Sequence, residues 1–264
     1  LRKVARATQP LDYLSSRPMA KAGGIAKAQE FLLKGGLPGI CFLRSSAMRV
    51  RKMRSHIKTI LDRDLRQVIR TDLDYLSLKT FLEELALRQG RSFELSALAR
   101  DSRISINTAR KLLSGLESVF LIRTVRKTGT SAGRVIYFED QGQASFLLAE
   151  RGLQLGAGHF RVSDWVRCLF QQVLAQLNYG KDLQGTLTTY ETRGGGLMDL
   201  VIQFEGHTLG LSVGTGNTAS PSQIKSAQSF RKQHPKSRVF LLHLGEASRT
   251  LDERLYEVPI GAFF

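Results

Sequence analysis

The scarcity of cysteine and of long apolar runs in the sequence excludes several classes of structure. Its 264 residues include only two cysteines and one tryptophan, and neither Cys41 nor Cys168 belongs to a C-x-x-C pair. This argues against a disulfide-stapled scaffold and against a structural zinc site, which needs about four closely spaced ligands. No stretch reaches about 18 uncharged apolar residues, so we expect no membrane-spanning helix.

Two unpaired cysteines in a long chain are typical of a reducing compartment. The segment Leu1–Ala7 is basic, but no apolar core or cleavage site follows it, so it does not resemble a signal peptide. We therefore expect a cytoplasmic protein with no membrane partner.

Acidic residues are also scarce. Lys and Arg number 39 against 23 Asp and Glu, which gives a net charge of +16. Residues 1–70 hold 16 of the basic side chains and only 4 of the acidic ones, so the surplus belongs to the N-terminal quarter. A surplus of this size favours a polyanionic partner, and nucleic acid comes before membrane because no amphipathic anchor is obvious. The alternative is a basic face that docks an acidic protein.

Residues 1–70 are expected to form a basic helical lead-in, loosely ordered over residues 1–24. Helices are expected at about 25–33 and 47–69, where apolar residues recur at helical spacing. The second helix carries the side chains that we expect to contact phosphate groups: Arg49, Arg51, Lys52 and Arg54.

Residues 71–142 carry the pattern of a winged helix-turn-helix, which is two short helices joined by a tight turn and followed by a hairpin. The expected elements are a helix over about 76–88, a short helix around 95–99, a second helix capped by Ser105, and strands over 121–126 and 134–138. The second helix should expose Ile106, Asn107, Arg110, Lys111 and Ser114. Asn107, Arg110 and Lys111 are of the types that reach base edges and phosphates.

Residues 140–157 are expected to be a transition, after which the sequence pattern changes. Over residues 158–264 we expect a helix at 159–177, strands at 185–191, 196–204 and 208–213, a helix at about 222–233 and a strand at 238–244. This order is of the α/β type, and a helix followed by three strands is the order of restriction-endonuclease-like nucleases. The predicted fold class is thus α/β plus all-α.

The residues of nuclease chemistry are incomplete. Such enzymes place an Asp on one strand and Glu-x-Lys on the next, because the carboxylates hold Mg²⁺ and the Lys orients water. Asp199 has the first position, but Ser212 and Gly214 replace the Glu and the Lys. We predict no catalytic residue and no metal site, and the alternative is a non-standard magnesium site made of Asp164, Glu191 and Asp199.

A phosphate-binding loop is missing as well. The pair Gly180-Lys181 is followed by Asp182 rather than by Ser or Thr. We therefore expect no ATP hydrolysis by this chain and no cofactor.

Several motifs nevertheless occur in the order found in one family. They are Leu33-Lys-Gly-Gly-Leu-Pro38, Ile57-Lys-Thr-Ile-Leu-Asp-Arg-Asp64, Tyr137-Phe-Glu-Asp-Gln-Gly142 and Met198-Asp-Leu-Val201. The series resembles prokaryotic AAA-family ATP-binding proteins that have a C-terminal domain of unknown function. The resemblance implies a winged helix, a nuclease-like fold and an ATPase module that this sequence lacks.

The sequence thus predicts the DNA-binding, non-catalytic C-terminal region of an AAA-type ATPase. The expected partners are double-stranded DNA and an ATPase module or ATPase partner, and formation of a homo-oligomer stays open. The alternatives are a magnesium-dependent nuclease with a non-standard site and a protein-interaction module that docks an acidic partner.

Overall fold

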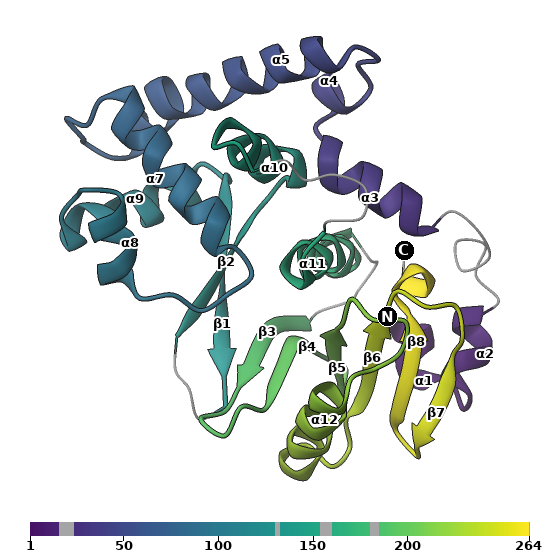
Figure 1. The fold of residues 1–264 in the computed structure, drawn as a ribbon. Helices are drawn as coiled ribbons and strands as arrows, with labels where there is room; N and C mark the ends of the chain where they lie inside the picture. The colour runs from purple at the N-terminus through teal and green to yellow at the C-terminus, as the bar shows by residue number, and fades with distance from the viewer. Residues whose placement is uncertain (16–23, 130–132, 154–159, 180–184, 264) are drawn as a thin grey trace. The chain divides into compact units, whose positions relative to one another are not determined.

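The computed structural model describes residues 1–15, 24–129, 133–153, 160–179 and 185–263, and all structural statements apply to these residues (Figure 1). The chain contacts divide it into two units. The helical unit comprises residues 29–124 and 134–160, and the sheet unit comprises 1–28, 125–133 and 161–264. The expectation of a mixed α/β protein with an additional helical part is confirmed.

The prediction of a loosely ordered lead-in is wrong for residues 1–15. Two helices occur there, α1 (Arg2–Arg6) and α2 (Pro10–Ser15). Val4 and Leu14 are buried, and the Arg238 guanidinium donates to the Val4 and Ala7 carbonyls at 2.9 and 2.7 Å. A contact with a residue more than 200 positions away stabilises α1, and local sequence patterns carry no information about such contacts. The rest of the predicted lead-in, residues 16–23, lies outside the described residues.

The helical unit is built from short helices around one apolar core. Its helices are α3 (Gly24–Lys34, which begins in the sheet unit), α4 (Pro38–Cys41), α5 (Ser46–Thr59), a π-helical turn η2 (Ile60–Asp64), α6 (Leu65–Val68), α7 (Tyr75–Arg88), α8 (Leu95–Asp101), α9 (Ile106–Ser118) and α10 (Gln141–Glu150). The helix expected over 47–69 is confirmed as α5, η2 and α6 in succession. Its buried residues include Met53, Ile57, Leu61 and Leu65, at the spacing that predicted it.

Residues 141–150 form α10, where the sequence indicated only a transition. Asp140 is the N-cap, and its Oδ1 accepts a hydrogen bond from the Gln143 N–H at 3.1 Å. Residues 141–148 are all buried, so no amphipathic period marks this helix in the sequence. The apolar run 146–148 is therefore its core-facing segment rather than a linker.

The eight strands form one mixed sheet with the order β2-β1-β3-β4-β5-β6-β8-β7. In chain order they are β1 (Ile122–Thr128), β2 (Arg134–Phe138), β3 (Gly185–Glu191), β4 (Leu197–Phe204), β5 (His207–Val213), β6 (Arg238–His243), β7 (Arg249–Asp252) and β8 (Leu255–Pro259). Strands β3, β4 and β5 are antiparallel neighbours, whereas β5, β6 and β8 are parallel. The sequence did not predict β7, which is exposed throughout and therefore has no alternation of apolar and polar residues.

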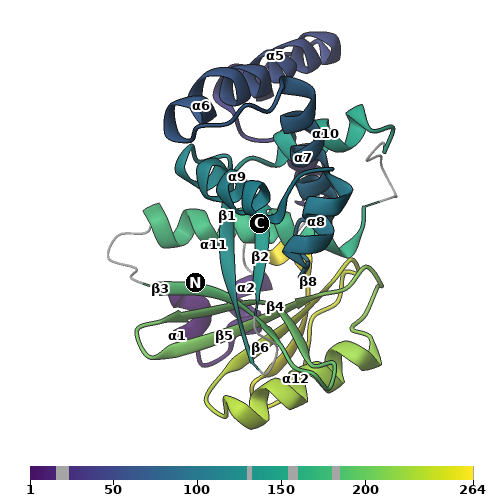
Figure 2. The ribbon, with the colours of Figure 1, turned by 90° about the vertical axis from the view of Figure 1, so that its left-hand side faces the viewer.

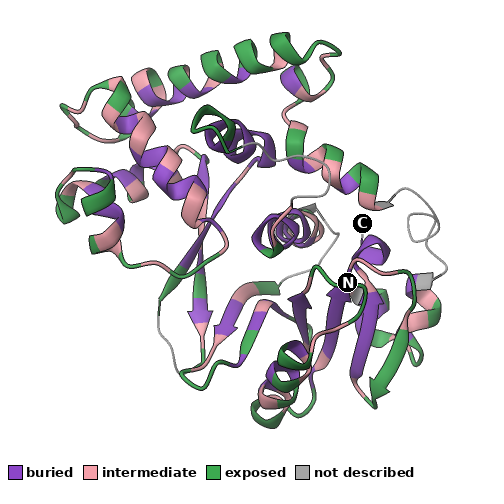
Figure 3. Cartoon of the chain, in the orientation of Figure 1, coloured by how far each residue is buried: buried purple, intermediate pink, exposed green. Residues whose placement is uncertain are grey.

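Two long helices cover the two faces of the sheet within the sheet unit. Helix α12 (Pro221–Gln233) lies on one face and α11 (Val162–Tyr179) on the other (Figure 2). Phe230 of α12 packs with Tyr190, Met198 and Leu241 in the core on its side. Burial is continuous along the central strands β5, β6 and β8 (Figure 3). Both helices were expected from the sequence, although residues 163–170 of α11 are all buried and not confined to one face.

Two motifs that are far apart in the sequence meet in the helical unit. The Gly36 N–H donates to Asp140 Oδ2 at 2.6 Å, which joins the turn after α3 to the start of α10. Gly35 has φ of +71°, and a Cβ there would lie 2.3 Å from Asp140 Oδ1. Only glycine fits this turn, because a side chain would be strained and would also displace the carboxylate.

We predict that Gly35→Ala lowers the free energy of unfolding by about 1–3 kcal/mol, since it introduces both strain and a clash. Urea denaturation followed by circular dichroism measures the effect. The matched control is Gly39→Ala in α4, where an added Cβ would meet nothing within 4 Å. Equal midpoints for the two variants would contradict the role of Gly35.

Candidate nucleic-acid interface

Helix α9 is held with one face in the core of the helical unit. Its N-cap Ser105 accepts a hydrogen bond from the Thr108 N–H at 3.1 Å, and Ala109, Leu112 and Leu116 are buried. Gly115 lets α9 approach the preceding helices closely, because a Cβ there would lie 2.8 Å from Leu65 Cδ1. This packing fixes which face of α9 is exposed to solvent.

The outward face carries the five side chains that the sequence predicted. All of them are exposed: Ile106, Asn107, Arg110, Lys111 and Ser114. The Arg110 guanidinium donates to Asn107 Oδ1 at 3.0 Å, one turn back along the helix. A contact between two exposed residues of one helix costs little to break, so both side chains can turn to another polar partner.

Lys111 is exposed, but its ammonium group has an intramolecular partner. Its Nζ donates to the carbonyl oxygen of Arg70, in the segment between α6 and α7. The same two residues line a hollow of about 310 Å³ with Thr108 and Asp72. Lys111 therefore stabilises this connection, and it is less available for an external anion than Arg110.

Arg110 lies on one wall of a second hollow in the helical unit. This hollow has a volume of about 520 Å³ and lies between α9 and β2, with Arg134 on the strand side. Its apolar lining comes from Phe93, Leu95, Leu113 and Ile136. The hollow thus combines an apolar lining with two exposed guanidinium groups and the carboxylate of Glu117.

Arg134 is a residue that the sequence reading missed. It is the first residue of β2 and directly follows the hairpin loop, of which residues 130–132 lie outside the described residues. The signal available in the sequence was a basic residue at the start of a predicted wing strand.

The basic residues of α5 have different environments. Arg49 is half-buried and donates through Nη1 to the carbonyls of Leu43 and Arg44 at 2.6 and 3.1 Å. Arg54 forms an ion pair with Glu150 at 2.8 Å, and this hydrogen bond raises the pKa of its guanidinium. Arg51 and Lys52 are exposed and form no ion pair with another described residue. Of the four residues predicted to contact phosphate, Arg51 and Lys52 are thus the two without a side-chain partner among the described residues.

The three carboxylates of the alternative magnesium site have separate partners in the sheet unit. Asp164 binds the buried Arg167 guanidinium at 2.8 Å, and Glu191 binds the Lys127 ammonium at 3.0 Å. The Val213 N–H donates to Asp199 Oδ2 at 2.7 Å. Within the described ranges, no group of three or more His, Cys, Asp or Glu side chains is arranged to hold a metal ion. Each of the three carboxylates therefore has a protein partner of its own.

The carboxyl group of Asp199 is buried, although the residue as a whole is half-buried. Burial raises its pKa to about 6, and the opposing hydrogen bonds from the Val213 N–H and from Ser212 do not offset this. Ser212 stands where the nuclease pattern has a Glu, so the environment of Asp199 contains a hydroxyl group instead of a second carboxylate.

Comparisons with known proteins give no established activity. Residues 25–151 match the profile of a family described as a domain of unknown function, DUF8612. Two relatives are the uncharacterized proteins Rv2008c of Mycobacterium tuberculosis (strain ATCC 25618 / H37Rv) and Mb2031c of Mycobacterium bovis (strain ATCC BAA-935 / AF2122/97). Each is 25% identical over 249 residues, which cover 89% of this chain and 53% of the relative.

The chain thus spans about half the length of the curated relatives it matches. No solved structure gives a significant match. Across the described segments, no helix is both long enough and apolar enough to cross a membrane.

We predict that Asp199→Asn changes the pH dependence of stability. A pKa raised from 3.8 to about 6 means that the folded protein binds more protons than the unfolded chain between these values. The stability of the wild type relative to Asp199→Asn should therefore rise as the pH falls from about 7 to about 4. Urea denaturation at several pH values measures this trend.

Asp252→Asn serves as a control for which we expect the opposite pH dependence of stability. The hydrogen bond from Arg231 lowers the pKa of Asp252, so the stability that this carboxylate provides is lost as the pH falls. A stability difference for Asp199→Asn that does not change with pH would show that its carboxyl group is not desolvated.

Proposed function

We propose that this chain binds double-stranded DNA through a winged helix-turn-helix in the helical unit. The order α7, α8, α9, β1 and β2 supports this interpretation. An antiparallel bridge between Ser92 and Val135 connects the segment between α7 and α8 to β2. The Glu139 N–H donates to the Leu121 carbonyl at 3.0 Å and closes the base of the hairpin. Two helices followed by a hairpin is the arrangement that places the second helix in the major groove.

The observation that carries the proposal is an anchored helix with exposed polar side chains on its outward face. The buried stripe of α9 fixes its orientation, while Asn107 and Arg110 remain exposed on the opposite face. Arg and Asn form two-point hydrogen bonds with guanine and adenine edges in the major groove. Arg134, across the hollow of about 520 Å³, adds a positive charge on the hairpin side. We assign base contacts to Asn107 and Arg110 and a phosphate contact to Arg134.

Arg51 and Lys52 of α5 supply a second basic surface. Helix α5 has five Lys or Arg residues and no acidic residue. Because Arg54 is paired with Glu150 and Arg49 is half-buried, the exposed Arg51 and Lys52 are the α5 residues to which we assign phosphate contacts. Such contacts position a protein on DNA without selecting a sequence.

The sheet unit has a non-catalytic role in this proposal. Its order of α11, three antiparallel strands, α12 and β6 supports the restriction-endonuclease-like interpretation. Its carboxylates have protein partners, which favours a docking or oligomer-forming role over hydrolysis. The proposed cooperation with an ATPase module rests on the ordered motifs, of which Gly35-Gly36 and Asp140 are in direct contact.

We predict that Arg110→Ala weakens duplex binding by about 5- to 50-fold, because a direct base or phosphate contact is lost. Fluorescence anisotropy with a labelled duplex at low salt measures the affinity. Arg63→Ala is the matched control, since Arg63 is an exposed arginine of the same unit that is paired with Asp64 at 2.7 Å. Unchanged affinity of Arg110→Ala would contradict the assigned role of α9.

The double variant Arg51→Gln/Lys52→Gln should reduce the salt dependence of binding. Each lost phosphate contact lowers the slope of log K against log salt by about 0.9. We therefore expect a slope that is smaller by about 2, with the same sequence preference as the wild type. An unchanged slope would remove α5 from the interface.

A protein that fails to bind any duplex would overturn the DNA proposal. If the same protein then retained an acidic protein partner after nuclease treatment, its basic surface would be a protein-docking face.

A further inference from the structure

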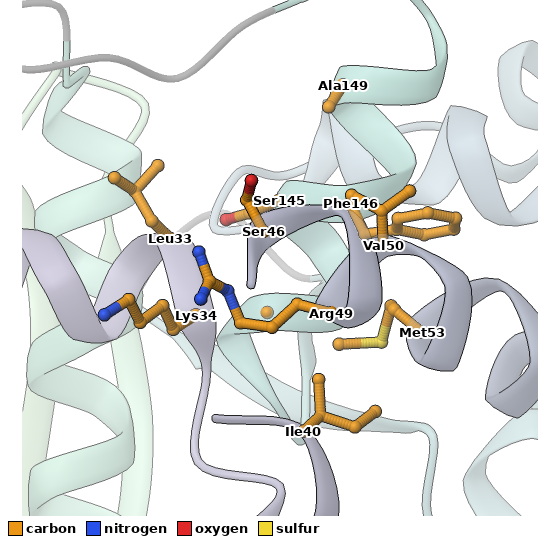
Figure 4. Close-up of a pocket in the computed structure, with 11 residues that line it drawn as sticks. Leu33, Lys34, Ile40, Ser46, Arg49, Val50, Met53, Ser145, Phe146 and Ala149 are labelled. Carbon is orange, nitrogen blue, oxygen red and sulfur yellow. The ribbon is translucent and has the colours of Figure 1, made fainter. Parts of the chain in front are cut away.

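A cavity of about 500 Å³ opens between α3, α5 and α10 of the helical unit (Figure 4). Its wall is mainly aliphatic and aromatic, and comes from Leu33, Ile40, Val50, Met53 and Phe146. Cavities of this size that are mostly apolar and hold a few polar groups are typical of sites for small molecules. The cavity is separate from the α9 surface, since the two share no lining residue.

The polar groups of the cavity are concentrated and positive. Lys34 and Arg49 line it, and no Asp or Glu does. In Figure 4 the Arg49 guanidinium is directed toward the α3 side, near Lys34 and Leu33, whereas Val50, Met53 and Phe146 lie together on the other side. One end of the cavity is therefore cationic and the rest is apolar.

Arg49 is held in place for such a contact. Its Nη1 donates to the carbonyls of Leu43 and Arg44, while Nε and Nη2 donate to no other described residue. A guanidinium fixed through one nitrogen presents the other two to an anion with little loss of side-chain entropy. The Lys34 ammonium is already paired with Glu30, one turn back on α3, so Arg49 is the cation available to a ligand.

Two apolar side chains of the wall are partly open to solvent. Leu33 is 43% exposed and Val50 is 42% exposed. Covering such side chains is favourable because apolar surface leaves water. An aliphatic chain along the wall would cover both, with its charged end beside Arg49.

We propose that this cavity binds a monocarboxylate with a medium-length aliphatic chain. The carboxylate pairs with Arg49, and the chain lies against Leu33, Val50 and Met53. This inference does not depend on DNA binding.

The test uses decanoate as the probe and 1-decanol as its uncharged counterpart, measured by calorimetry and by displacement of 1-anilinonaphthalene-8-sulfonate. Ligands of this size reach dissociation constants on the order of 10–100 μM. We expect decanoate to bind in this range, at least about 10-fold more tightly than 1-decanol, because the alcohol cannot pair with a cation. Octanoate should bind more weakly than decanoate, because burial of each methylene contributes about 0.8 kcal/mol to the binding free energy, which is roughly 4-fold in affinity.

Three variants locate the binding. Val50→Trp fills the cavity and should weaken decanoate binding at least about 10-fold. Arg49→Gln should weaken decanoate binding by roughly 5-fold or more and leave 1-decanol nearly unchanged, and Arg49→Lys, which keeps the positive charge, should lose less. Arg51→Gln is the matched control, since Arg51 is on the same helix but does not line the cavity. Circular dichroism shows which variants are folded, and Val50→Trp covers the case in which Arg49→Gln is not.

Three outcomes would overturn the proposal: no binding of decanoate at millimolar concentration, equal affinity for decanoate and 1-decanol, or unchanged binding by folded Val50→Trp. Binding to vesicles of phosphatidylcholine and phosphatidylglycerol without binding of monomeric decanoate would also contradict it, because the surface would then be a membrane contact.

Discussion

The burial of one face of α9 is the constraint on which the proposed interface depends. Ala109, Leu112 and Leu116 leave water together, and Gly115 allows α6 to approach without a side chain between the helices. A helix anchored in this way cannot rotate, so the residues between the buried positions must face outward. The orientation of Arg110 is thus fixed by apolar packing, whereas its charge takes no part in the folding of the unit.

Some basic side chains of the chain form intramolecular contacts, whereas others remain exposed to an external partner. Arg49, Arg54 and Lys111 were all expected to contact nucleic acid, yet each holds a carbonyl or a carboxylate of the same chain. Arg51 and Arg110 remain exposed at the surface. The net charge of +16 already counts each ion pair as neutral, so the pairing decides which basic side chains can meet a polyanion and leaves the total charge unchanged.

The sequence predicted α7 and α9 from apolar residues at helical spacing, and it also predicted β2, whose residues 135–138 are all buried without alternation. It missed α1 and α10, because a contact with Arg238 stabilises α1 and because α10 is buried on all sides. The exposure of Asn107 and Arg110 followed from helical spacing. The partners of Lys111 and Asp164 did not, since hydrogen bonds between segments depend on the tertiary fold. Arg134 was missed because its importance comes only from its place opposite α9.

The most direct measurement is a chemical-shift map of the ¹⁵N-labelled protein during titration with a short duplex. The proposed interface predicts the largest changes in α9, at Arg134 and around Arg51, with a smaller response in α12 and β7 of the sheet unit. Changes confined to the sheet unit, or no changes at low salt, would contradict the assignment of α9 as the surface that contacts DNA.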